Sequence, residues 1–133
     1  MLDTNVVVSA LLSPAGFEDR VLKLVVRGQV QLYVSPPVLA EYERVLTNSK
    51  FSFSKLRVQS VLSRLRAASH TVHPVRGLSG CRHDDDNRFL ECADAAGAGF
   101  LITGNQRHFP ARWKQTQIVN ARQFLEQTVS IRR

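Results

Sequence analysis

Short apolar runs alternate with longer segments of helical periodicity along the whole chain, and this alternation restricts the fold more than any other feature. The apolar runs end just before Asp3 and then recur at residues 30–34, 70–75, 99–103 and 117–119. Between them, apolar side chains are spaced as on one face of an α-helix. Because parallel strands need long crossover connections, the order strand–helix–strand predicts an α/β protein with a parallel sheet.

Residues typical of helix beginnings and ends mark the limits of the helical segments. The expected helices cover residues 6–12, 17–27, 36–46, 54–68, 89–96 and a last segment after Asn120. Prolines directly after Ser35 suit a first helical turn, while Gly28 and Gly97 are typical of helix ends. No linker, internal repeat or low-complexity segment interrupts the sequence, so we expect one domain over residues 1–133.

Composition excludes some classes of protein and favours others. The formal net charge is +7, with fourteen arginines and four lysines, and arginine suits phosphate oxygens. No apolar stretch approaches the roughly 20 residues of a membrane span, and no signal peptide is recognisable, so a cytoplasmic protein is expected. The two cysteines, Cys81 and Cys92, are too few for a disulfide scaffold and are expected to be reduced.

Three adjacent aspartates, Asp84, Asp85 and Asp86, stand out in so basic a chain. Neighbouring carboxylates disfavour one another's ionised forms, so their grouping requires an explanation. One explanation is a solvated turn that caps the following helix. The other is a cation site.

The positions of the other acids favour the cation site. Asp3 ends the first strand, Glu41 lies in the helix after the second, the aspartates 84–86 follow the third, and Asn105 follows the fourth. Ligands of parallel α/β sheets bind beyond the carboxyl ends of the strands, where these side chains are expected to converge. Carboxylate oxygens suit Mg²⁺ or Mn²⁺, and a basic surface retains a polyanion, so the pattern indicates metal-dependent phosphodiester cleavage.

Four ordered blocks carry a resemblance to a known family. They are LDTNVVVSALL, SPPVLAEYERVL, DDDNRFLECADAAGAGFLITGN and the following RHFP. Together they resemble the PIN domain family, and in particular the toxins of toxin–antitoxin pairs that are related to the VapC ribonucleases. The similarity covers nearly the whole chain.

The resemblance implies a three-layer α/β/α fold with a central parallel sheet of four to five strands, and RNA hydrolysis that depends on Mg²⁺ or Mn²⁺. It implies metal ligation by Asp3, Glu41 and Asp86, because the pattern Asp-x-x-Phe-Leu-x-x-Ala starts at Asp86; Asp85 is the alternative. An antitoxin protein and a homodimer are the implied protein partners, and no membrane is involved. The resemblance implies further site residues around these acids: Asn105 in the catalytic set, and Thr4, Asn5 and Thr103 orienting the acids. Arg107 and His108 follow the site loop, where they are either RNA contacts or ordinary surface residues near a turn.

Two departures from the family keep other functions open. The fourth acidic position is Asn105 here, and only Met1 and Leu2 precede Asp3, so the first strand is short. Both departures favour a second class of function, a catalytically weak or silent PIN-like module that binds RNA or an antitoxin. A HAD-type phosphatase is a third class, but the sequence after Asp3 has Asn5 where the motif D-x-D-x-T requires a second aspartate.

Overall fold

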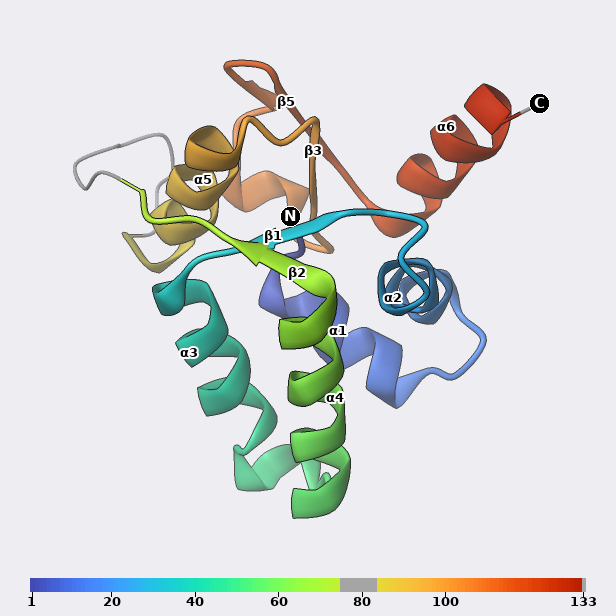
Figure 1. Ribbon diagram of the computed structural model, residues 1–133, viewed down its shortest axis with the longest axis vertical. Helices are drawn as coiled ribbons and strands as arrows, with labels where there is room; N and C mark the ends of the chain where they lie inside the picture. The colour runs from blue at the N-terminus through green and yellow to red at the C-terminus, as the bar shows by residue number, and fades with distance from the viewer. Residues whose placement is uncertain (75–83, 133) are drawn as a thin grey trace.

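The computed structural model describes residues 1–74 and 84–132, and within them the side chains of residues 84–86 and 129–132 lie outside the description. Helices and short strands alternate, which confirms a mixed α/β protein (Figure 1). The elements in chain order are α1 (Thr4–Leu12), α2 (Phe17–Val26), β1 (Leu32–Val34), α3 (Pro36–Leu46), the 3₁₀ turn Ser49–Phe51, α4 (Lys55–Ala68), β2 (Ser69–Thr71), α5 (Asp84–Ala96), β3 (Phe100–Ile102), the 3₁₀ turn Gln106–His108, β4 (Arg112–Trp113), β5 (Thr116–Val119) and α6 (Ala121–Arg132).

The helices begin and end at the polar and glycine signals that predicted them. The Ser35 hydroxyl accepts the N–H of Val38 at 3.3 Å and caps α3, with proline in the first turn. Gly28 and Gly97 follow α2 and α5 with φ of 75° and 63°, a left-handed conformation that costs glycine little. Helix α5 begins at Asp84, ahead of the predicted start at residue 89, so the aspartates that were expected just before this helix belong to its first turn.

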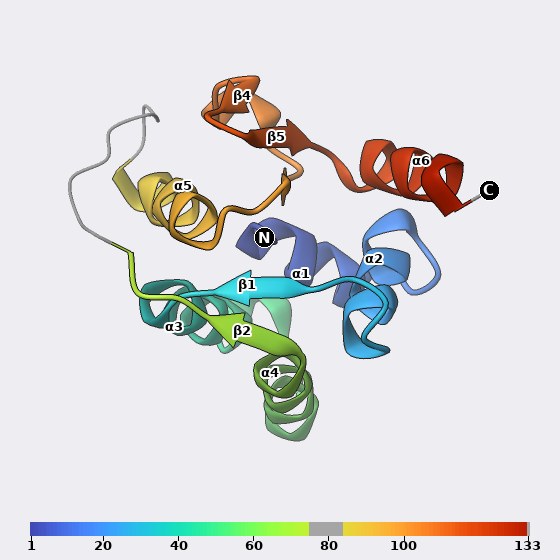
Figure 2. The ribbon, with the colours of Figure 1, turned by 45° about the horizontal axis from the view of Figure 1, so that its top comes forward.

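The strands form two separate sheets, which corrects the predicted central parallel sheet of four to five strands. Strands β1 and β2 pair in parallel, whereas β5 lies between β3, its parallel partner, and β4, its antiparallel partner. Figure 2 shows the β1–β2 pair and the β4–β5 pair apart, with the N-terminus between them. Residues 1–3 bond to β3 through one isolated bridge, Leu2 to Ile102, and no backbone hydrogen bond within residues 1–74 joins them to β1.

One predicted strand is much shorter than expected, and one strand was not predicted. The segment predicted over 70–75 is a strand only at Ser69–Thr71, and residue 75 lies outside the described part of the chain. Strand β4 was not predicted, because two residues show no periodicity. Its turn into β5 uses Lys114 with φ of 54°, a conformation for which lysine gives no sequence signal.

The core lies between the sheets and the helices that connect them. Helix α1 is buried on most of its surface and packs against α2 and α3, while α5 contacts both β1 and β3. Helix α6 packs against α2 and β3. It lies on the side of the molecule away from α3 and α4 (Figure 1). None of the described helices is both long and apolar enough to cross a bilayer.

Candidate active site

Asp3 lies where the N-terminal segment meets α1, with 6 % of its surface exposed. It occupies the N-cap position of α1, yet its side chain makes no capping hydrogen bond. Instead, the hydroxyl of Thr103 donates to Asp3 Oδ2 at 2.6 Å. Thr103 follows β3 directly, and the Asp3 N–H donates to the Ile102 carbonyl at 2.9 Å, so backbone and side chain both hold Asp3 at the end of β3.

Glu41 lies on α3, with 8 % of its surface exposed. The hydroxyl of Thr4 donates to Glu41 Oε2 at 2.5 Å. Because Thr4 follows Asp3 in the chain, this bond brings the second acid to the same end of the structure as the first. A second buried carboxylate is therefore held by the residue that directly follows Asp3.

Tyr42 follows Glu41 on α3 and lies close to both acids. The sequence indicated only a core role for it. Its buried hydroxyl donates to the carbonyl of Leu2, which fixes the residue before Asp3 to α3. Burial, then the neighbouring groups Cys92, Asp3 and Glu41, raise the pKa of Tyr42 well above its usual value. The hydroxyl therefore stays protonated and remains a donor.

The segment after β3 is tied to the start of α1. The Gly104 N–H donates to Asn5 Oδ1 at 3.0 Å, and the Asn105 N–H donates to Thr103 Oγ1 at 3.0 Å. Thr103 thus accepts from Asn105 and donates to Asp3, so one hydroxyl links the loop backbone to the carboxylate. The Asn105 side chain itself is exposed to solvent.

Helix α5 contributes a side chain to the same site. Arg88 Nη1 lies 3.5 Å from Glu41 Oε1, and Arg44 Nη2 lies 3.5 Å from the same oxygen. Arg88 belongs to the helix that begins with the three aspartates 84–86. The side chains of these aspartates lie outside the described residues, and their predicted role stays a prediction.

Arg107 and His108 follow the site loop in the 3₁₀ turn. The His108 N–H donates to the Asn105 carbonyl at 3.0 Å, Arg107 is exposed and His108 is half-buried. Both residues therefore lie at the surface beside the loop that carries Thr103. This is where a ligand approaching Asp3 from solvent would meet a positive charge.

The donor set suits a hard divalent cation. Where the side chains are described, no three histidine, cysteine, aspartate or glutamate side chains gather as a metal-binding group. The site offers carboxylate oxygens from Asp3 and Glu41, each oriented by a threonine hydroxyl, beside the helix turn of Asp86. Oxygen donors of this kind fit Mg²⁺ or Mn²⁺ rather than softer metals.

The sequence pattern missed the two arginines and Tyr42 at this site. Arg44 lies at i+3 from Glu41, and this spacing places the two side chains on the same face of α3. That spacing was an available signal, whereas Arg88 gave none, because its contact with Glu41 joins two different helices. Tyr42 gave none, because a tyrosine on the apolar face of a helix is usually a core residue.

Comparison with known proteins assigns the chain to a family. The family model described as PIN domain matches residues 1–107. The chain therefore belongs to the PIN domain family, whose members are generally nucleases that use divalent metals.

A curated relative matches most of the chain but has no assigned activity. The chain is 29 % identical over 109 residues to the uncharacterized protein MJ1680 of Methanocaldococcus jannaschii. The match covers 80 % of this chain and 70 % of that protein. No solved structure gives a significant match.

Proposed function

We propose that the protein is an endoribonuclease that depends on Mg²⁺ or Mn²⁺ and acts as the toxin of a toxin–antitoxin pair. One observation carries the proposal: the buried carboxylates of Asp3 and Glu41 converge from distant elements, each held by a threonine hydroxyl. Two buried acids in a basic protein are costly unless a cation or a reaction requires them. Membership of a family of nucleases supplies the reaction.

Asp3, Glu41 and Asp86 are the residues that would hold the cation. A divalent ion held there would lower the pKa of a water molecule and neutralise charge that grows on a phosphodiester. The chain's own residues fix the geometry: Thr103 orients the carboxylate of Asp3, and Thr4 orients that of Glu41. Arg44 and Arg88 offset the charge of Glu41 through its other oxygen, Oε1.

The charge of the surface supports a nucleic acid as the substrate. The chain has a net charge of +7, and arginine matches the geometry of phosphate oxygens. Arg107 is exposed beside the site loop, and Arg112 is exposed on β4. We propose that these two arginines contact the RNA backbone and deliver a phosphodiester to Asp3.

A groove between α2 and α4 supports a protein partner. Its cavity of about 340 Å³ is lined by apolar side chains, among them Leu22, Val61 and Leu65, and by the basic residues Arg27 and Arg64 together with the Lys23–Asp19 ion pair. An acidic amphipathic segment of an antitoxin suits the apolar lining and the two arginines. Replacing Arg27 and Arg64 with glutamate should then weaken inhibition by the antitoxin without changing cleavage by the free toxin.

The experiment that tests the proposal is cleavage of varied RNAs by purified protein, with Mg²⁺, with Mn²⁺ and with EDTA. We expect cleavage only with a divalent ion, and none by Asp3→Asn. A silent binding module is the second candidate, because Asn105 replaces an acid and is exposed. RNA binding without cleavage, in wild type and in Asn105→Asp, would support that candidate instead.

A further inference from the structure

Half of the glutamines in the chain line one groove. The chain has eight glutamines, and four of them border an open cavity of about 440 Å³ between α6, β5 and the 3₁₀ turn after β3, namely Gln106, Gln117, Gln123 and Gln127. Arg112 of β4 borders the same cavity, directly opposite Gln117 in the β4–β5 ladder. Glu126 also borders it and is paired with Arg122 at 3.0 Å. This glutamine groove therefore suits a polar ligand rather than an apolar one.

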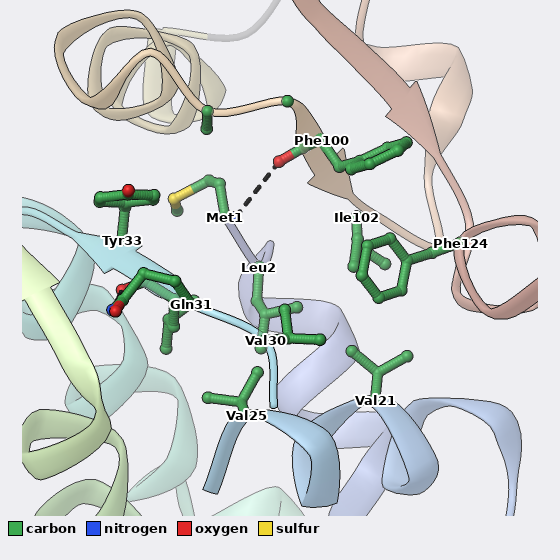
Figure 3. Close-up of a pocket in the computed structure, with 13 residues that line it drawn as sticks. Met1, Leu2, Val21, Val25, Val30, Gln31, Tyr33, Phe100, Ile102 and Phe124 are labelled. Carbon is green, nitrogen blue, oxygen red and sulfur yellow. Dashed lines mark hydrogen bonds between the residues drawn. The ribbon is translucent and has the colours of Figure 1, made fainter. Parts of the chain in front are cut away.

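Helix α6, one wall of the glutamine groove, is fixed to the core by another of its faces. The ring of Phe124 packs edge-on against that of Phe100 in β3, with the ring centroids 5.1 Å apart. Figure 3 shows Phe124 beside Ile102, where both line a small and mostly apolar cavity of about 80 Å³. Gln123, the residue before Phe124, is exposed. The helix cannot turn its glutamines away without displacing a core side chain, so this wall of the groove is rigid.

Two of the glutamines are held in a defined orientation. Gln123 Oε1 accepts the N–H of Asn120 at 2.9 Å, while the N–H of Gln123 donates to Asn120 Oδ1 at 2.8 Å, a reciprocal cap of α6. Gln106 Nε2 donates to the same Gln123 Oε1 at 3.1 Å and to the carbonyl of Ile118 at 3.5 Å. Because a backbone N–H must meet an oxygen, this network fixes which atom of each amide is oxygen and which is nitrogen.

The remaining polar atoms of this pair are one donor group and one acceptor. A carboxamide has two donors on its nitrogen and an acceptor on its oxygen. Gln123 Nε2 and Gln106 Oε1 make no hydrogen bond within the described part of the chain, because their partner atoms take up the contacts between the two residues. A donor beside an acceptor matches the edge of a nucleobase, and glutamine pairs in this way with the amino group and N7 of adenine.

The pair lies next to the candidate active site. Gln106 is three residues after Thr103, whose hydroxyl donates to Asp3, so the chain limits the separation of the Cα atoms of Gln106 and Thr103 to about 11 Å. Gln123 lies in the first turn of α6, the helix that follows β5, and β5 is the parallel neighbour of β3. Both glutamines therefore lie beyond the carboxyl ends of parallel strands, where ligands of α/β proteins bind.

We propose that the glutamine groove reads the base of an unpaired nucleotide next to the phosphodiester that reaches Asp3. The inference rests on the proposed nuclease function and deepens it, because it gives the RNA substrate a sequence preference. Gln106 Oε1 accepts from an amino group of the base, and Gln123 Nε2 donates to a ring nitrogen. Adenine carries both groups on one edge, and that edge is accessible in single-stranded RNA, so adenine is the expected base.

The test measures RNA binding by the full chain with Asp3→Asn, so that cleavage does not compete. The probes are short oligouridylates with uracil, adenine, cytosine or guanine at the central position, and binding is followed by fluorescence anisotropy. We expect the adenine probe to bind about fivefold or more tightly than the uracil probe, the lower end for a bidentate base contact. Gln123→Glu keeps the oxygen that caps α6 and removes the donor, whereas Gln106→Met removes the acceptor from an exposed residue. Each change should remove most of the preference.

Gln127→Glu is the matched control, because it adds the same charge to the same groove one turn further along α6. It should weaken the binding of all four probes alike and keep the preference. Equal affinity for the four probes, or a preference that survives both Gln106→Met and Gln123→Glu, would overturn the proposal. Metal-dependent cleavage by wild type without a base preference would refute this inference alone, whereas a base preference in binding without any cleavage would refute the proposed nuclease function alone.

Discussion

Thr103→Val isolates the hydrogen bond that orients Asp3. Thr103 is fully buried, and its hydroxyl donates to Asp3 Oδ2 at 2.6 Å while it accepts the N–H of Asn105. Valine keeps nearly the same shape and removes only the hydroxyl. A hydrogen bond to a charged group contributes about 1.5–3 kcal/mol. If that free energy is expressed in the transition state, kcat/KM for RNA cleavage should fall about 10- to 100-fold, at roughly 1.4 kcal/mol for each factor of ten.

Thr116→Val is the matched control. Thr116 is also buried, lies in β5 beside β3, and donates its hydroxyl to the Ala98 carbonyl at 2.7 Å, away from both acids. Both variants should lose about 1–3 kcal/mol of unfolding free energy in urea, because each leaves a buried acceptor without a donor. Only Thr103→Val should slow cleavage of a fluorescent RNA and raise the Mn²⁺ concentration needed for half-maximal rate. Equal kcat/KM in the two variants would refute the role assigned to Thr103.

Three further predictions address the terminus, the RNA surface and the loop. For a chain that begins at Met1, the unfolded state binds more protons than the folded state between pH 6 and 8, so urea unfolding should show stability rising by about 2–3 kcal/mol across that range, and acetylation should abolish the rise. Replacing Arg107 and Arg112 with alanine should weaken RNA binding and reduce the slope of log K against log salt by about 1.4, with metal affinity unchanged; an unaltered slope would exclude these contacts. Asn105→Asp should tighten Mn²⁺ binding in calorimetric titration if its side chain faces the acids, and an unchanged affinity would place it outside the site.

The helices could be predicted from sequence because their signals are local. Proline after Ser35, glycine at 28 and 97, and apolar spacing define the helices without reference to the rest of the fold. The rule that strand ends meet at one edge likewise brought Asp3 and Glu41 to one place, and the structure joins them through Thr4. The alternation of strands and helices was sufficient for that step.

The division into two sheets could not be predicted, because pairing depends on contacts between distant segments. Nothing local in Leu2 indicates that it pairs with Ile102 and that residues 1–3 make no backbone hydrogen bond to β1 among the described residues. The same holds for the contact of Arg88 with Glu41, which depends on how α5 packs against α3. Periodicity identifies helices and strands. Tertiary packing determines which strands pair and which residues a charged side chain contacts.

The most direct test of the central claim is RNA cleavage by wild type and Asp3→Asn, purified identically and measured beside RNA affinity. The account predicts that wild type cleaves with Mn²⁺ or Mg²⁺ and stops in EDTA. Asp3→Asn should show no cleavage with either ion, while its Kd for RNA stays within about twofold, because the basic residues supply the binding. Cleavage by Asp3→Asn at the wild-type rate, or wild-type cleavage that persists in EDTA, would contradict the claim that Asp3 holds the metal for this reaction.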